Sequence, residues 1–340
     1  MTDSQPARPA SAPAGFSLQR VRIVAGRVLG TIARTRELTM VVILLVTMFV
    51  MANLNQYFLT GANFRAMAIG FAPTAIISVG MAILLVSGGF DLSVGAVLAL
   101  SGTVVAKLML DGWVQVTAII AVLVMGGFVG LINGLLVTKI RVNPLVATLG
   151  TLSAARGLSL VLTEGFSLIG LPQSFGTVGS EQLLGIPYMV VIMFVVIIIG
   201  DLALRHTRYL RQVYYIGSNE TAARLSGIPV DRVKIFTYML TATLAALSGV
   251  MLASRLMAGT PTAASGMELQ VLAASVIGGA SLTGGEGSVL GAFLGVVFVG
   301  MISNAMTMLA VSIYWQQVIT GAILIIAVAI DMLIRRRSTV

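Results

Sequence analysis

The sequence predicts an all-α integral membrane protein with about ten transmembrane helices, from its composition, its spaced apolar runs and the placement of its basic residues. Hydrophobic residues make up 57% of the chain and charged residues 10%, and the mean hydropathy is +1.01. A soluble domain carries about 25% charged residues, so a soluble chain of this composition could not cover its surface with polar groups. Lipid is therefore the solvent that the composition predicts.

The composition also excludes most catalytic chemistry. There is no Cys, and His206 is the single His, which argues against disulfides, metal clusters and histidine-based hydrolysis. No GxxxxGK[ST] phosphate loop occurs. The net charge of +9 is typical of basic cytoplasmic loops rather than of a nucleic-acid-binding surface. We therefore expect no catalytic residue, metal site or cofactor in this chain, and no nucleic-acid partner.

Residues 1–37 are polar and contain three prolines followed by several arginines. This composition predicts a disordered, basic cytoplasmic segment. No small-residue cleavage pattern follows the apolar run 40–51, and many more apolar runs come later, so we do not expect a cleaved signal peptide.

Apolar runs divide the following polytopic domain, residues 38–334, which a basic tail, 335–340, follows. About 20 apolar residues cross a bilayer core of about 30 Å. The eighth run is short and flanked by glycines. The expected spans are 38–54, 67–86, 92–110, 115–138, 144–163, 186–203, 236–253, 267–283, 288–310 and 315–334.

The basic residues predict the orientation of these spans. With both termini in the cytoplasm, the segments on that side hold 17 of the 21 Lys and Arg residues, a bias that the positive-inside rule favours. The 17 residues are Arg8, Arg20, Arg22, Arg27, Arg34, Arg36, Lys139, Arg141, Arg205, Arg208, Arg211, Arg224, Arg232, Lys234, Arg335, Arg336 and Arg337.

The two halves of the chain resemble each other weakly. Gly89-Phe-Asp-Leu-Ser-Val matches Gly266-Met-Glu-Leu-Gln-Val at an offset of 177, and Asn133 matches Asn304 at an offset of 171. Spans two to five would then match spans seven to ten, in opposite orientation because the copies are five spans apart. Inverted repeats are typical of transporters, in which the substrate path lies between the copies.

The loop 204–235 carries the signals of a short helix. Ser218 is a candidate N-cap, Glu220 lies in the first turn, Gly227 suits a left-handed end, and Pro229 blocks continuation. A helix this short is not stable alone in water. It needs a surface to pack on, which is either a partner protein or the lipid headgroups.

Two acidic motifs open predicted spans. Asp91 and Ser93 are either a helix N-cap or a gate on the cytoplasmic side. Glu268 and Gln270 are their repeat counterparts near the opposite mouth, where another protein or an entering solute would meet them.

Further polar residues interrupt the apolar spans. Asn133 and Asn304 either bond helix to helix or line the path. Arg156 either lines the path or forms an ion pair between helices, with Glu164 as a candidate partner. Otherwise its side chain extends to the outer surface. Gln316 and Gln317 either cap span ten or line the path.

Several motifs occur in a fixed order along the chain: Gly88-Gly-Phe-Asp-Leu-Ser-Val-Gly95, Asn143-Pro-Leu-Val-Ala-Thr-Leu-Gly-Thr151 with Ala155-Arg-Gly157, Gly217-Ser-Asn-Glu-Thr-Ala-Ala-Arg-Leu-Ser-Gly-Ile228, Ile277-Gly-Gly-Ala-Ser-Leu-Thr-Gly-Gly-Glu-Gly-Ser288 and Tyr314-Trp-Gln-Gln317. Through these motifs the sequence resembles, from about Glu37 to Arg336, the ribose-type permeases of bacterial ABC sugar importers. Two departures from the family pattern are Phe90, where Ile is usual, and Glu286, where a basic residue is frequent.

The resemblance implies an inner-membrane permease that forms the path for a small sugar or sugar derivative. It implies a second permease, identical or a sibling, two cytoplasmic ATPase subunits that hold ATP and Mg²⁺, and a periplasmic sugar-binding protein. It also implies that the ATPase docks on the 217–228 helix. The docking residues would be Gly217, Ser218, Asn219, Ala222, Ala223, Arg224, Gly227 and Ile228.

The alternative is a stand-alone, ion-coupled secondary transporter, which would also contain inverted repeats. Such a transporter should carry paired carboxylates or a His relay at mid-membrane. Most acidic residues of this chain fall near the ends of predicted spans, which favours the importer.

Overall fold

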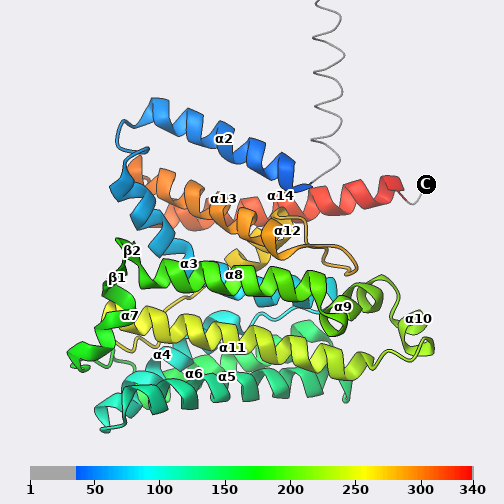
Figure 1. Ribbon diagram of the computed structural model, residues 1–340, viewed down its shortest axis with the longest axis horizontal. Helices are drawn as coiled ribbons and strands as arrows, with labels where there is room; N and C mark the ends of the chain where they lie inside the picture. The colour runs from blue at the N-terminus through cyan, green and yellow to red at the C-terminus, as the bar shows by residue number, and fades with distance from the viewer. Residues whose placement is uncertain (1–35, 339–340) are drawn as a thin grey trace, which may run out of the picture.

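The computed structural model describes residues 36–338, which form a bundle of helices (Figure 1). The predicted all-α class is confirmed. Ten helices correspond to the ten predicted spans: α2 (Arg36–Leu54), α3 (Gly61–Val86), α4 (Val94–Leu110), α5 (Gln115–Thr138), α6 (Pro144–Thr163), α8 (Tyr188–His206), α11 (Val230–Leu256), α12 (Met267–Ile277), α13 (Val289–Met308) and α14 (Ile313–Ser338). The predicted disordered segment lies outside the described residues up to residue 35.

Shorter elements connect these helices. A 3-10 turn η1 (Gln173–Gly176), helix α7 (Thr177–Ser180) and an antiparallel hairpin of β1 (Gln182–Leu183) and β2 (Ile186–Pro187) precede α8. Helices α9 (Arg208–Ser218) and α10 (Glu220–Leu225) lie between α8 and α11. Helix α11 therefore begins at Val230, six residues before the predicted start of span seven.

Within residues 36–338, seven helices are long and apolar enough to cross a membrane, and α4 and α12 are shorter apolar helices. The predicted span at 267–283 is wrong. Helix α12 has 11 residues, about 16 Å at a rise of about 1.5 Å per residue, which is half of a bilayer core of about 30 Å. It ends early because Gly279 adopts a left-handed φ of 97°, which stops a helix.

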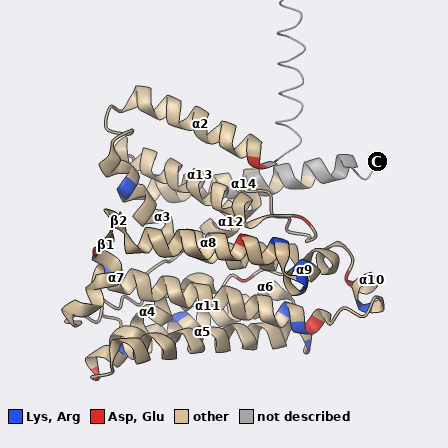
Figure 2. Cartoon of the chain, viewed as in Figure 1, with Lys and Arg blue, Asp and Glu red and all other residues tan. Residues whose placement is uncertain are grey.

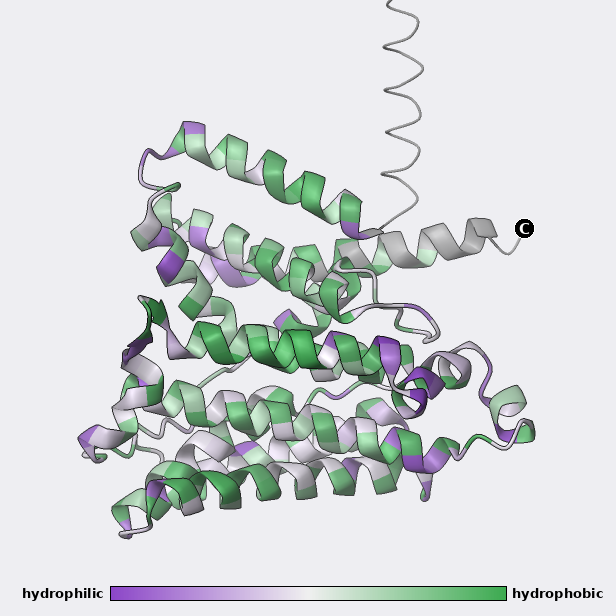
Figure 3. Cartoon of the chain, viewed as in Figure 1, coloured by the Kyte–Doolittle hydropathy of each residue, from purple (hydrophilic) through white to green (hydrophobic). Residues whose placement is uncertain are grey.

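Helix α11 lies in the centre of the bundle and packs against α3, α4 and α5. Glycines allow the backbones to touch: a Cβ added at Gly130 of α5 would lie 2.6 Å from the Cα of Met239. Close packing through small residues is typical of membrane helices, because lipid removes the hydrophobic drive between them. The outer faces are apolar (Figure 3), as the exposed side chains of Phe49, Val124 and Ile199 illustrate.

Helices α3 and α11 are each followed by an irregular segment, residues 87–93 and 257–266, before a shorter helix begins. The starts of these shorter helices, α4 and α12, meet inside the bundle, because a Cβ at Gly95 would lie 2.2 Å from the Glu268 carboxylate. Interrupted helices at matched positions of two inverted halves are typical of transporters. The arrangement agrees with the weak repeat in the sequence.

The start of α2 and the end of α14, which begin and end the described residues 36–338, lie at the same end of the bundle as α9 (Figure 1). Glu37 accepts a hydrogen bond from Ser288 Oγ at 3.0 Å, and Tyr214 of α9 donates one to the neighbouring carbonyl of Gly287 at 2.9 Å. Helix α14 also ends on this side (Figure 1). Lys and Arg gather around α9, α10 and the adjoining helix ends (Figure 2), and we call this side the basic end.

Candidate functional site

Helix α10 is the short helix that the sequence predicted, with a different cap. The side chain of Asn219 accepts a hydrogen bond from the backbone N–H of Ala222 at 2.9 Å, whereas Ser218 is the last residue of α9. The prediction that Ser218 is the cap is therefore wrong. The predicted end is confirmed: Gly227 has a φ of 80°, and the N–H of Ile228 reaches the carbonyl of Ala223 at 3.1 Å.

Ion pairs hold α10 against the start of α11 and the end of α5. Glu220 pairs with Arg224 at 2.9 Å and with Lys234 at 2.6 Å. Asp231 pairs with Arg224 at 2.6 Å and with Lys139 at 2.7 Å. We call these five residues the α10 ion-pair network.

The network decides the charge of Glu220. Partial burial opposes the ionised form, but hydrogen bonds from Lys234 and Arg224 outweigh it, so the pKa of Glu220 lies below its ordinary value. Glu220 is therefore ionised at neutral pH.

One face of α10 is anchored and the other is open. Ala223 is buried in the main core, and Ile228 packs against the same core. On the outer side, Leu225 is 86% exposed. Ala222 and Ser218 line a hollow of about 450 Å³ between α9 and α10. A capped helix that turns an apolar side chain outward beside a hollow is suited to docking another protein.

Gly217 of α9 contacts the backbone of the bundle rather than the outer surface. A Cβ at Gly217 would lie 1.9 Å from the carbonyl oxygen of Val86 and 2.3 Å from the nitrogen of Gly285. Gly285 donates a hydrogen bond to Val86 at 2.9 Å. The segment just before α10 therefore touches both the end of α3 and the turn after α12.

Asp91, Ser93 and Asn133 form a network with Thr151 inside the membrane-spanning region. The carboxylate of Asp91 accepts hydrogen bonds from the backbone N–H of Ser93 at 2.7 Å, from its hydroxyl, and from the amide of Asn133 at 3.2 Å. Thr151 donates to the Asn133 carbonyl. Asp91, Ser93 and Asn133 are fully buried, so this buried network joins the start of α4 to α5 and α6.

Arg156 of α6 is held by backbone carbonyls rather than by Glu164. It donates to Pro261 and Ala263, each at 2.8 Å, in the irregular segment before α12. Glu164 instead ends α6 in a left-handed conformation, with a φ of 53°. Glu268 lies in the first turn of α12, and its Oε2 is buried without a hydrogen-bond partner among residues 36–338. Arg156 therefore supports an irregular segment inside the membrane, where free carbonyls are costly.

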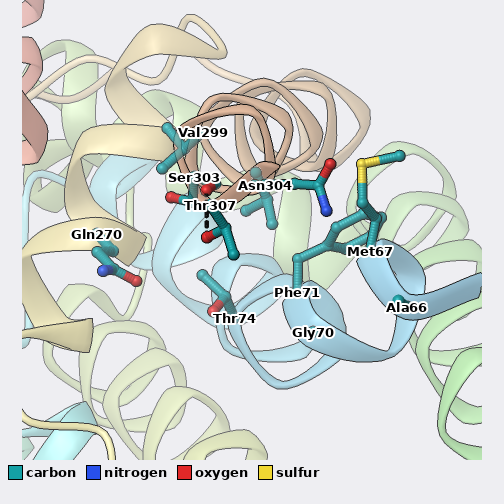
Figure 4. A pocket seen from close by; sticks show the side chains of 12 residues that line it. Ala66, Met67, Gly70, Phe71, Thr74, Gln270, Val299, Ser303, Asn304 and Thr307 are labelled. Carbon is teal, nitrogen blue, oxygen red and sulfur yellow. Dashed lines mark hydrogen bonds between the residues drawn. The ribbon is translucent and has the colours of Figure 1, made fainter. Parts of the chain in front are cut away.

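Gln270 and Asn304 line a second hollow, of about 260 Å³, between α3, α12 and α13 (Figure 4). The Asn304 amide exchanges two hydrogen bonds with Asn63 of α3, at 2.9 and 3.2 Å. We call this cavity the membrane hollow. The two residues of the predicted pair therefore have different surroundings, because Asn304 lines the membrane hollow and Asn133 does not.

The glutamines of α14 have separate surroundings. Gln316 donates to the carbonyl of Val311 at 3.1 Å, and the Gln317 side chain is exposed. Neither lines the membrane hollow.

Sequence reasoning missed other residues of the membrane hollow. Thr74 and Phe71 of α3 and Ser303 and Thr307 of α13 line it. A signal was present in α13, where Ser303, Asn304 and Thr307 recur at helical spacing on one face. Across residues 36–338, no group of three or more His, Cys, Asp or Glu side chains is placed to hold a metal ion.

Residues 63–328 match a family model described as the branched-chain amino acid transport system / permease component. The chain is 40% identical over 290 residues to the ribose import permease protein RbsC of Bacillus subtilis, covering 85% of this chain and 90% of that protein. It is 36% identical over 274 residues to the L-arabinose ABC transporter permease protein AraH of Azospirillum brasilense, covering 81% of each chain.

The D-allose transport system permease protein AlsC of Escherichia coli is also 36% identical, over 282 residues that cover 83% of this chain and 86% of that protein. No solved structure matches this chain.

Proposed function

Because the chain belongs to the branched-chain amino acid transport system / permease component family, and within it to the permeases of ABC sugar importers, we propose that it forms the membrane path for a small sugar and couples this path to ATPase subunits. The observation that carries the proposal is the match along most of the chain to permeases named for ribose, L-arabinose and D-allose.

A neutral sugar fits the membrane hollow better than an amino acid does. Its polar lining residues are Thr74, Gln270, Ser303, Asn304 and Thr307, and no charged side chain lines it. A zwitterionic amino acid would lose the hydration of two charges there without gaining a charged partner, which is costly at low dielectric.

Helix α10 is the proposed docking site of the ATPase. Its Leu225 side chain points outward and is 86% exposed within the described residues. Its ion pairs fix its orientation, and Gly217 links it to both interrupted helices. ATP-driven movement at α10 would thereby reach the end of α3 and the turn after α12.

The proposed assembly contains a second permease, two cytoplasmic ATPase subunits with ATP and Mg²⁺, and a periplasmic sugar-binding protein. The chain itself performs no bond-making step. The proposed location is the bacterial inner membrane, with the basic end and both termini in the cytoplasm.

Uptake by proteoliposomes that contain the whole assembly tests this function. The permease is reconstituted with its ATPase and its binding protein, and radiolabelled ribose, arabinose, allose and leucine are offered with and without ATP. We expect ATP-dependent uptake of at least one sugar and none of leucine. Uptake that persists without ATP and stops with an ionophore would support the secondary transporter instead.

Cysteine labelling tests the orientation. The chain contains no Cys, so Ser218→Cys on the basic end introduces a single reactive thiol. An impermeant maleimide should label it in inside-out vesicles and not in intact cells. Labelling from outside intact cells would reverse the proposed orientation.

A further inference from the structure

We propose that the membrane hollow is a sugar-binding site of the permease itself, at which Ser303, Gln270 and Thr74 select the cargo by hydrogen-bonding its hydroxyl groups. This inference rests on the proposed function. It adds that selection occurs inside the membrane as well as at the binding protein.

Three polar side chains that line the hollow, those of Ser303, Gln270 and Thr74, form no hydrogen bond with another residue within 36–338. The backbone carbonyl of Ser303 accepts a hydrogen bond from the Thr307 hydroxyl at 3.0 Å, which leaves the Ser303 hydroxyl free. Inside a membrane, an unpaired polar group costs several kcal/mol, so it must meet water or a ligand. Asn304 differs, because its side-chain amide is hydrogen-bonded to Asn63, which holds it in place on the wall of the hollow.

The hollow extends from the surface into the membrane interior. Thr74 lies 13 residues into α3, about 20 Å along the helix at a rise of about 1.5 Å per residue, and is buried. Gly70 and Thr307, which also line the hollow, are exposed on the surface of the described chain, and Thr307 lies in the last turn of α13. A polar hollow that extends from a helix end to the depth of Thr74 needs water or a ligand along it, because lipid cannot bond its polar groups.

The hollow matches a monosaccharide in size and chemistry. A volume of about 260 Å³ equals that of about nine waters at about 30 Å³ each, which is room for one monosaccharide. Met67 and Phe71 form an apolar wall beside the polar side chains (Figure 4). A sugar ring likewise has C–H faces and a rim of hydroxyls. Sites for small molecules combine apolar surface with a few placed polar groups in this way.

The chain offers a substitution that fills the hollow without disturbing the fold. A Cβ at Gly70 would meet no atom within 4 Å, and Gly70 lines the hollow. Leu is also a better helix former than Gly. Gly70→Leu should therefore leave the permease folded and block the site.

The matched control is Gly150→Leu. Gly150 is also a helical glycine with nothing within 4 Å of an added Cβ, but it lies in α6, away from the hollow. ATP-driven sugar uptake in proteoliposomes should be lost in Gly70→Leu and retained in Gly150→Leu. Equal uptake by both would overturn the proposal. So would loss of uptake together with loss of the second permease on gel filtration, since the hollow would then be a subunit interface.

A second experiment measures binding directly. The permease in nanodiscs, without the binding protein, is titrated with ribose and observed by saturation-transfer NMR. Loss of one hydrogen bond should weaken ribose binding about three- to tenfold in Ser303→Ala. The control Ser153→Ala alters an exposed serine of α6 that does not line the hollow and should bind as the wild type does. Identical affinities of Ser303→Ala and the wild type would overturn the proposal.

The two proposals fail in different ways. If the wild-type assembly imports no sugar, the proposed function is wrong. If it imports a sugar and Gly70→Leu imports it equally well, the function stands and the membrane hollow is not a binding site.

Discussion

The buried network around Asp91 and the α10 ion-pair network both join helices that are distant in sequence, yet they do so by different physics. In the first, a single carboxylate is surrounded by neutral hydroxyl, amide and N–H donors, out of contact with water. In the second, acidic and basic side chains pair at the basic end, where Arg224 is about half exposed. Loss of one partner inside the bundle is costly, because the polar group left unpaired there cannot form a hydrogen bond with water instead. Exposed pairs contribute only about 0.2–1 kcal/mol each, so they orient α10 more than they stabilise the protein.

The largest expected effect is that of Asn133→Leu, which removes a donor to Asp91 and the acceptor of Thr151. Leaving buried groups unpaired costs about 1–3 kcal/mol each, and more for a charged group. We expect a marked fall in the midpoint of thermal unfolding in detergent, measured by loss of the monodisperse gel-filtration peak.

Asn304→Leu is the matched control, since it alters the repeat counterpart. Its partner Asn63 is only half-buried and can be hydrated, so the midpoint should fall less. An equal fall of the unfolding midpoint in the two variants would contradict the expectation that the buried network around Asp91 stabilises the protein more than the Asn304–Asn63 contact does.

The next effect concerns docking at the other network. Ala222→Trp places a large ring on the exposed side of α10, where no room remains if a partner packs closely. We expect a folded permease that no longer retains its ATPase on co-purification. Ala222→Ser, which adds a single oxygen, should retain it. If the tryptophan variant retains the ATPase and imports sugar normally, α10 lies on lipid headgroups rather than on a protein.

The smallest effect is the pH dependence of the α10 ion-pair network. Because the folded-state pKa of Glu220 lies below its ordinary value of 4.5, the stabilisation is present above about pH 4.5 and is lost as the pH falls through the lowered pKa. A spin label at position 225 should therefore gain mobility only in strongly acidic buffer. In Glu220→Gln the label should be more mobile at pH 7 and lose this pH response. A wild-type label whose mobility already changes between pH 6 and pH 7 would contradict the assignment to Glu220.

Some features of the candidate site could be predicted from nearby residues in the sequence, and others could not. The start and end of α10 follow from Asn219, Gly227 and Pro229, which lie within a few residues of one another, and the error at Ser218 is a shift of one position. The different surroundings of Asn133 and Asn304 could not be predicted, since similar sequence contexts lead one side chain to Asp91 and the other to Asn63. The membrane role of the residues that line the hollow stays a prediction until transport is measured.

The sequence by itself determined the all-α class, the approximate bounds of most spans and the family. It could do so because a membrane helix satisfies its own backbone hydrogen bonds, so the length of an apolar run nearly suffices to define it. Only the tertiary structure decided that α12 stops halfway, that α4 and α12 meet at their starts, and that Thr74, Gln270 and Ser303 converge on one hollow. The meeting of α4 and α12 and the convergence on the hollow depend on contacts between segments far apart in the sequence, such as Thr74 and Ser303, which are set by close packing of small side chains and which no local pattern records.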